Sequence, residues 1–273
     1  MMAIVNQICQ GLYRFAHKSL KTRAEIGRLN AQDHAGARAL VRVFEAVLAN
    51  KKTPEEAEWI AKIESLRGEL NRDPTRITVI DYGAGSPGSH RTEEEMLEGV
   101  PVTRTIDDIC LKASKPYTWA LLLFRLVREF QPSVCLELGT CLGISTVYQA
   151  AALTLNRGGR IITLEGAQTL ADLARKNFER LALGDIVLKV GRFQDTLGQV
   201  LKDEPRIDFA FIDGHHDEHA TLGYFEQLYS CLSESAIVVF DDISWSNGMK
   251  RAWRTIAADQ RIALSVDLFR VGV

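Results

Sequence analysis

From Lys115 to the C-terminus, short apolar runs alternate with amphipathic segments of helical length. Such runs are typical of buried strands, and strands that alternate with helices form a parallel sheet covered on both faces. We expect strands at Val134–Leu138, Arg160–Leu164, Ile186–Val190, Ile207–Ile212, Ala236–Phe240 and Ile262–Val266. The last apolar piece, "LFRVGV", is expected to return as an edge or inserted strand. The pattern predicts an α/β fold with a doubly wound, Rossmann-like, mostly parallel sheet of seven strands.

The first 75 residues show helical periodicity instead. The apolar side chains that share one helical face are Leu40, Val43, Phe44, Val47 and Leu48. The stretch "TPEEAEWIAKIESL" predicts the start of a helix, with Thr53 as N-cap and Glu56 completing a capping box. We therefore expect a helical N-terminal extension over residues 1–75, a connecting segment and candidate lid loop over 76–112, and the α/β domain over 113–273.

The composition is that of an ordinary globular protein and excludes several classes. Of the 273 residues, 46% are hydrophobic and 25% charged, and the net charge of −2 disfavours general nucleic-acid binding. No apolar run is long enough to span a bilayer, and the N-terminus does not have the pattern of a secretory leader. The five cysteines form no C-x-x-C pair, which indicates reduced thiols and a cytoplasmic protein without a membrane partner.

The N-terminal region has a local excess of positive charge. Residues 1–52 carry nine Lys or Arg against three Asp or Glu. Solvated faces of amphipathic helices explain this excess, and a docking surface for an acidic partner is the alternative. The same helices are candidates for a homodimer contact.

Two glycine turns compete for the role of a nucleotide site. The first, in "ITVIDYGAGSPGSH", is a literal G-x-G-x-x-G from Gly83 to Gly88. Neither an amphipathic helix nor a strand ending in an acid follows it, and Pro87 removes a backbone donor that a phosphate would need. We therefore interpret this turn as a surface loop.

The second turn, in "SVCLELGTCLGIST", has the expected context. A strand ends at Gly139, a helix begins after Gly143, and the next strand ends in Glu165, 22 residues beyond Gly143. That acid is placed to accept hydrogen bonds from ribose hydroxyls. The close glycine pair that lets a backbone approach a pyrophosphate is missing, which disfavours a nicotinamide oxidoreductase. The spacing favours a nucleoside without a diphosphate, such as S-adenosylmethionine.

Five motifs appear in a fixed order: "LELGTCLGIST", "ITLEG", "GRFQDTL", "FAFIDGHH" and "VVFDDISWSNG". In this order they resemble the class I S-adenosylmethionine-dependent methyltransferases, and most closely the cation-dependent O-methyltransferase branch typified by the catechol and caffeoyl-CoA enzymes. The resemblance covers residues 113–273, so the α/β domain is expected to be a methyltransferase domain.

The resemblance implies a role for each matching position. The residues expected around the cofactor are Glu137, Gly139, Thr140, Gly143, Ser145, Glu165, Gln194, Asp195 and Asp213. Of these, the group up to Gly143 would surround the amino-acid end, Ser145 would donate to its carboxylate, and Glu165 would hold the ribose. Gln194 and Asp195 would lie at the adenine edge, with a helix N-cap pair as the alternative.

Three carboxylates follow two strands that are expected to be neighbours. Asp213 ends one strand and Asp241 and Asp242 end the next, so all three should converge at the carboxyl edge of the sheet. Oxygen ligands suit Mg²⁺ or another hard divalent cation. The related enzymes usually have Asp and then Asn at the second pair. The alternative has Asp213 capping the next helix and Asp241 contacting the cofactor, with no metal.

The same region offers a catalytic base. His216 lies three residues after Asp213, where the catechol-type enzymes carry a catalytic lysine, and a histidine can take a hydroxyl proton at neutral pH. Trp245 is a candidate aromatic wall over the acceptor or, alternatively, a core residue. We expect an enzyme that methylates a hydroxyl of a small molecule with cation assistance, with His216 and Asp213 catalytic. The alternatives are methylation of a nitrogen or of RNA, and a non-catalytic S-adenosylmethionine-binding module.

Overall fold

The computed structural model describes residues 26–85 and 91–273. The chain divides into two compact units, residues 1–51 and 52–273. The first unit contains α2 (Ala35–Leu48), whose sequence includes the predicted apolar face. Residues 1–25 lie outside the described part, and with them four of the nine basic positions of residues 1–52.

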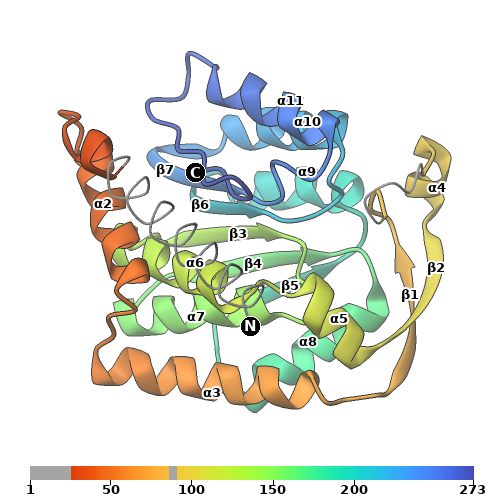
Figure 1. The fold of residues 1–273 in the computed structure, drawn as a ribbon. Helices are drawn as coiled ribbons and strands as arrows, with labels where there is room; N and C mark the ends of the chain where they lie inside the picture. Colours follow the sequence, from red (N-terminus) through yellow and green to blue (C-terminus); the bar gives the residue numbers. More distant parts are fainter. Residues whose placement is uncertain (1–25, 86–90) are drawn as a thin grey trace, which may run out of the picture. The chain divides into compact units, whose positions relative to one another are not determined.

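The second unit alternates strands and helices from its middle onward (Figure 1). Its elements are α3 (Pro54–Leu70), β1 (Arg76–Asp81), α4 (Glu93–Glu98), β2 (Val100–Thr105), α5 (Ile106–Ala113), α6 (Tyr117–Phe130), β3 (Val134–Leu138), α7 (Ile144–Asn156), β4 (Arg160–Glu165), α8 (Gln168–Arg180), β5 (Ile186–Val190), α9 (Phe193–Asp203), β6 (Ile207–Ile212), α10 (Glu218–Tyr229), β7 (Leu232–Phe240) and α11 (Asn247–Ala257). The predicted capping box of Thr53 and Glu56 starts α3.

The main sheet has the order β5-β4-β3-β6-β7, and its strands are all parallel. Helices α6, α7 and α8 cover one face, while α9, α10 and α11 cover the other (Figure 1). On the second face, Leu136 and Ile212 of the sheet belong to one buried apolar cluster with Phe225 of α10 and Trp253 of α11. The predicted α/β Rossmann-like architecture is therefore confirmed. Since β3 lies between β4 and β6, the chain changes direction across the sheet at β3, where ligands of such folds bind.

The sheet has five strands in the described chain instead of the predicted seven. Residues 262–266 do not form a strand, and the C-terminal segment returns beside β7 only through isolated antiparallel bridges, Phe240 to Gly272 and Asp267 to Gly272. Val266 and Val273 exchange two backbone hydrogen bonds of 2.7 and 3.0 Å. The apolar pattern identified residues that pair, such as Val266 and Val273. The turn between these two residues is tight, so too few pairs form for either side to be a strand.

The segment between α3 and α5 contains regular structure of its own. Strands β1 and β2 pair antiparallel from Arg76 opposite Thr105 to Asp81 opposite Val100, with α4 in the connection between them. We refer to residues 76–85 and 91–105 as the arm. Three hydrogen bonds attach the arm to residues that follow β4, β5 and β6: Thr169 Oγ1 of α8 to Thr78 O (3.2 Å), Arg192 Nη1 to Leu97 O (2.7 Å) and Ala84 N to His215 O (2.9 Å).

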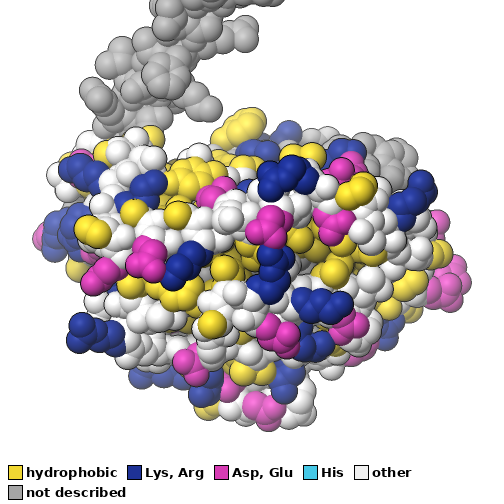
Figure 2. All heavy atoms as spheres, turned by 90° about the horizontal axis from the view of Figure 1, so that it is seen from below, with side chains coloured by type: hydrophobic (Ala, Val, Ile, Leu, Met, Phe, Trp, Pro, Cys, Tyr) yellow, Lys and Arg dark blue, Asp and Glu magenta, His cyan; other side chains and the backbone are white. Residues whose placement is uncertain are grey.

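The surface in Figure 2 shows Lys and Arg side chains interspersed with Asp and Glu. This agrees with the near-neutral net charge and gives that face no uniformly basic character. Among the helices of residues 26–85 and 91–273, none is both long and apolar enough to cross a bilayer.

Candidate active site

The second glycine turn lies at the carboxyl end of β3 and depends on two glycines. Gly139 has φ 106°, and a Cβ atom there would collide with the carbonyl oxygen of Asp213. Gly143 has φ 81° at the start of α7, and a Cβ atom there would collide with the ring of Phe178. Positive φ is easily reached only by glycine, and no side chain fits at either place. The turn therefore brings bare backbone to the edge of the crevice.

Glu165 ends β4 beside this turn. Its carboxylate accepts hydrogen bonds from the backbone N–H groups of Cys141 (2.7 Å) and Ala167 (2.9 Å). Burial raises the pKa of Glu165 above its ordinary value, although these two N–H groups act in the opposite direction. The side chain thus connects the second glycine turn to the end of the neighbouring strand, and its predicted contact with a ribose stays a prediction.

Glu137 is buried inside the protein. The residue is 0% exposed, and its carboxylate accepts hydrogen bonds from Thr146 Oγ1, Thr163 Oγ1 (2.7 Å) and Gln149 Nε2 (2.9 Å). Burial raises its pKa, opposed by the hydrogen bonds from Thr146 and Thr163. The side chain of Glu137 therefore ties β3 to α7 and β4, and its contact with the cofactor stays a prediction.

The remaining cofactor positions lie at the same edge of the sheet. Thr140 and Ser145 are buried in the turn and the first residues of α7, and Thr140 shares a 2.6 Å hydrogen bond with Thr163. Gln194 and Asp195 are exposed in the first turn of α9, beyond β5. The alternative prediction, that Gln194 and Asp195 are a helix N-cap pair, is wrong because Arg192 is the N-cap of α9. Asp195 forms an ion pair with Arg192 at 2.6 Å.

Asp213 and Asp241 come together as predicted, but a lysine lies between them. Lys115 Nζ donates to Asp213 Oδ1 at 3.0 Å and also to Asp241 Oδ2. Asp242 pairs with Arg270 at 2.9 Å. The alternative cap role of Asp213 is wrong, since the side chain of Asp217 caps α10.

The charged groups of this cluster shift one another's pKa values. Burial raises the pKa of Asp241, the negative charge of Asp213 adds to the effect, and the pKa reaches about 7. Burial likewise raises the pKa of Asp213, opposed by the charge of Lys115. Burial disfavours the charge of Lys115, but Asp213 and Asp241 outweigh it, and the pKa of Lys115 lies above its ordinary value. The lysine is therefore a permanent cation at neutral pH.

The three carboxylates do not form the predicted metal site. In the described ranges, 26–85 and 91–273, no three His, Cys, Asp or Glu side chains are arranged to hold a metal ion. Two of the predicted ligands, Asp213 and Asp241, bind the ammonium group of Lys115, and the third, Asp242, binds a guanidinium. The donor set present therefore does not fit a divalent cation. Lys115 gave no sequence signal because it lies 98 and 126 residues from its two partners.

His216 lies beside this cluster. Its Nε2 is 3.8 Å from Asp213 Oδ1, the oxygen that Lys115 also binds. His216 has φ 50°, a left-handed conformation that is unusual for histidine and is found often at functional sites. Burial lowers its pKa, opposed by the charges of Asp242 and Asp241.

Trp245 is half-buried and lies next to His216, with ring centroids 5.9 Å apart. The core alternative for Trp245 is therefore wrong, and the tryptophan in the apolar cluster is Trp253.

The first glycine turn lies against the same edge of the sheet. A Cβ atom added to Gly166, the residue after Glu165, would lie 2.8 Å from the ring of Tyr82. Ala84 N donates to His215 O, as noted above. Residues 81–85 therefore contact both the residue that follows β4 and the loop that follows β6. Pro87 and Gly88 of the literal G-x-G-x-x-G lie outside the described residues.

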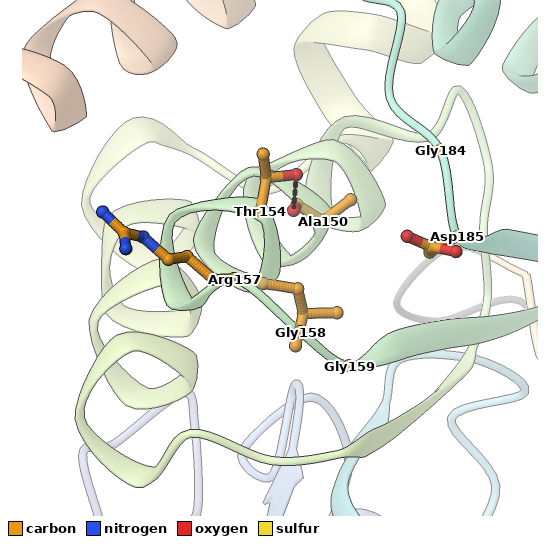
Figure 3. Close-up of a pocket in the computed structure, with 8 residues that line it drawn as sticks. Ala150, Thr154, Arg157, Gly158, Gly159, Gly184 and Asp185 are labelled. Carbon is orange, nitrogen blue, oxygen red and sulfur yellow. Dashed lines mark hydrogen bonds between the residues drawn. The ribbon is translucent and has the colours of Figure 1, made fainter.

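A cavity of about 250 Å³ lies at the other edge of the sheet (Figure 3). It is lined by Arg157, Gly159 and Asp185, among others, which immediately precede β4 and β5. Its position at the amino ends of the strands separates it from Glu165 and Asp213, which follow the carboxyl ends. We therefore assign the candidate site to the carboxyl edge.

Comparison with known proteins agrees with this class of site. Residues 136–243 match the family described as "Methyltransferase domain". The matched stretch and the fold thus resemble those of the class I S-adenosylmethionine-dependent methyltransferases, as the sequence predicted. Within that class, the chain is similar to proteins of the catechol-type O-methyltransferase branch.

Two curated relatives carry this similarity. A catechol O-methyltransferase from Niastella koreensis is 34% identical over 120 residues, 43% of this chain and 52% of the relative. Catechol O-methyltransferase from Bos taurus is 30% identical over 122 residues, 44% of each chain. The matches span about half the length of these relatives.

Solved structures share the fold. Cofactor-bound Rv0187 from MTB gives a TM-score of 0.53 at 18% identity, with 85% of this chain and 95% of that chain covered. The SAH-bound methyltransferase PaMTH1 of Podospora anserina also gives 0.53 at 18% identity, with 59% and 78% covered. At such identities the likeness concerns the fold alone.

Proposed function

We propose that this protein is an S-adenosylmethionine-dependent enzyme that methylates a hydroxyl group of a small molecule. The observation that carries the proposal is the glycine turn at β3, joined by backbone hydrogen bonds to Glu165 at the end of β4. The match to the methyltransferase domain family and the names of the curated relatives support it.

The residues at the carboxyl edge would have separate roles in a methyl transfer. The bound cofactor would supply a methyl group on a positively charged sulfur. Glu165 would accept hydrogen bonds from the ribose, and the backbone of the turn would approach the amino-acid end. Methyl transfer requires in-line alignment and exclusion of water, so most of the catalytic effect would come from positioning. Tyr82 of the arm would cover the crevice beside Gly166.

His216 would act as the base. As the acceptor oxygen forms its bond to the methyl carbon, the carbon–sulfur bond breaks, and its electron pair remains on the sulfur. The hydroxyl proton passes to the imidazole of His216, which burial favours in its neutral form. Trp245, which lies next to His216, would form an aromatic wall of the acceptor site. The cation-assisted version does not fit the donor set, so no step is assigned to a metal.

The excess of carboxylates at the crevice disfavours a polyanionic acceptor such as RNA. The arm between α3 and α5 fits the expected lid, and residues 113–273 remain our assignment of the methyltransferase domain. Homodimerisation through the N-terminal helices remains a prediction.

Calorimetric titration of the full chain with S-adenosylmethionine and with NAD tests the cofactor assignment. We expect binding of S-adenosylmethionine and none of NAD. Glu165→Ala should weaken the binding by about 1–3 kcal/mol through the lost ribose hydrogen bonds. Glu204→Ala is the matched control, because Glu204 pairs with Arg160 at the amino end of β4 and its loss should leave the affinity unchanged. Equal affinities for the wild type and a folded Glu165→Ala variant would refute the assignment.

Turnover with catechol and other simple phenols as probe acceptors tests the chemistry. His216→Ala should lower the rate of methyl transfer by roughly 10²–10⁴-fold while leaving S-adenosylmethionine affinity intact. Cofactor binding without transfer to any hydroxyl compound would instead support the non-catalytic binding module.

A further inference from the structure

We propose that the ammonium group of Lys115 replaces the divalent cation of the crevice, so that this protein transfers methyl groups without a metal. The inference rests on the proposed function and deepens it. It assigns to Lys115 the role of a fixed positive charge at the acceptor oxygen.

The position of Lys115 is the first argument. Its ammonium group bridges Asp213 and Asp241, the ends of the neighbouring strands β6 and β7. These are two of the three carboxylates that the sequence placed around a cation. The residue is only 8% exposed, and the cation therefore lies within the carboxylate cluster and not in solvent.

The backbone of Lys115 is held in place by neighbouring helices. Lys115 lies between α5 and α6, and its carbonyl accepts a 2.7 Å hydrogen bond from Arg67 of α3. Arg67 pairs with Glu64 at 2.8 Å, and Glu64 accepts a 2.8 Å hydrogen bond from the hydroxyl of Tyr148 on α7. A chain of contacts from α3 and α7 thus fixes the backbone of the lysine, so the ammonium group is presented by a preorganised segment.

Charge gives a further argument. A divalent ion bound by Asp213 and Asp241 would lie next to a buried ammonium, and like charges at such short separations repel strongly. Asp242, which would complete the ligand set, instead pairs with Arg270. The two basic side chains therefore offset two of the three carboxylate charges, as a bound divalent metal would.

The arrangement also places the cation next to the base. Asp213 Oδ1 lies 3.0 Å from Lys115 Nζ and 3.8 Å from His216 Nε2. An ammonium has three N–H donors, and Asp213 and Asp241 accept two of them. The third is assigned to the acceptor oxygen. Lys115 keeps its protons throughout: the hydroxyl proton goes to His216, the oxygen–carbon bond forms, the carbon–sulfur bond breaks, and the ammonium stabilises the negative charge that develops on oxygen.

Titration with Mn²⁺, monitored by the electron paramagnetic resonance of the free ion, tests the inference directly. The wild-type full chain should show no specific Mn²⁺ site. Lys115→Ala should create one, with affinity raised roughly tenfold or more, because the two carboxylates are left without their cation. Adding Asp213→Asn to Lys115→Ala should remove the new site. Lys112→Ala is the matched control, since Lys112 is an exposed lysine that pairs with Asp108 on α5.

The wild type alone can overturn the inference, even if Lys115→Ala does not fold. A 1:1 Mn²⁺ complex of the wild type that Asp213→Asn abolishes would refute it. The same holds for transfer to catechol that EDTA abolishes and Mg²⁺ restores. Unchanged transfer in EDTA supports it. Loss of S-adenosylmethionine binding, measured separately by calorimetry without metal, would instead contradict the proposed function.

Discussion

Two places in the second unit bury carboxylates against basic side chains, and they differ in how the charges balance. At the start of α3, Glu56 is 4% exposed and pairs with Arg125 at 2.8 Å and Arg128 at 3.3 Å, both on α6. At the carboxyl edge of the sheet, Asp213 and Asp241 share one lysine. We refer to these as the Glu56 cluster and the Asp213 cluster.

In the Glu56 cluster two arginines pair with one carboxylate. Burial acts to raise the pKa of Glu56, but the backbone N–H of Thr53 and the two arginines outweigh it, and the pKa is lowered. In the Asp213 cluster the acids are in excess, and the pKa of Asp241 is raised to about 7. A buried carboxylate whose charge is offset by cations is typical of structural contacts. Acids that are not fully offset at the carboxyl edge of a parallel sheet are typical of functional sites, where a ligand completes the balance.

Removal of the carboxylate of the Glu56 cluster should give the largest effect on stability. Glu56→Ala leaves Arg125 and Arg128 without their acid and removes the capping box of α3. We expect the free energy of unfolding to fall by about 3–5 kcal/mol, which chemical denaturation measures. Affinity of the folded variant for S-adenosylmethionine should be unchanged. A stability loss below about 1 kcal/mol would show that this cluster is not structural.

The two clusters should respond to pH with opposite signs. Asp241 has a folded pKa of about 7 against an ordinary value of 3.8, so its contribution to stability is present below pH 4 and is lost as the pH rises through 7. Glu56 has a folded pKa below its ordinary value of 4.5, so its contribution is present above pH 4.5 and is lost as the pH falls through the folded pKa.

Denaturant unfolding of the wild type, Asp241→Asn and Glu56→Gln from pH 3 to 8 measures this difference. The wild type should lose stability relative to Asp241→Asn between about pH 4 and 7, by at most about 1.4 kcal/mol per pH unit. Relative to Glu56→Gln, it should lose stability only on the acid side. Asp259→Asn is a partly exposed control with a folded pKa of about 2, and it should show no slope between pH 5 and 7. If the stability of Asp241→Asn and that of the wild type change in parallel with pH, the raised pKa of Asp241 is contradicted.

The smallest effect is expected in the arm. Gly85 has φ 81°, so Gly85→Ala should cost about 1 kcal/mol of stability. The affinity for S-adenosylmethionine should stay intact, because the arm is not a phosphate-binding turn. Calorimetry measures the cofactor affinity of Gly85→Ala, and turnover with a phenolic probe measures its rate. Gly198→Ala is the matched control, because a Cβ atom at this position of α9 meets open space. Slower turnover with normal affinity would support the lid. A loss of cofactor affinity would overturn the choice between the two glycine turns.

Local patterns predicted most of the parallel sheet. The limits of β3, β5 and β6 agree with the sequence prediction to the residue, because each is an apolar run bounded by polar or turn residues. The prediction failed at residues 262–266. Apolar character marks residues that will be buried, but it does not say whether a neighbouring strand runs alongside for more than one or two pairs. The two-stranded sheet of the arm was missed for the same reason, since β2 pairs with β1 across an intervening helix.

The sequence by itself determined the class of the domain. A glycine turn after one strand and an acid at the end of the next are local features, and they predict a nucleoside site whatever surrounds them. Only the tertiary structure decided what occupies the carboxylate cluster. Lys115 precedes the sheet in the chain, and its pairing with Asp213 and Asp241 exists only because the fold brings the α5–α6 connection over the ends of β6 and β7. An ion pair depends on distance in space, and spacing along the chain does not encode it. The burial of the Glu137 side chain was likewise decided by the tertiary structure, because its three hydrogen-bond partners come from α7 and β4.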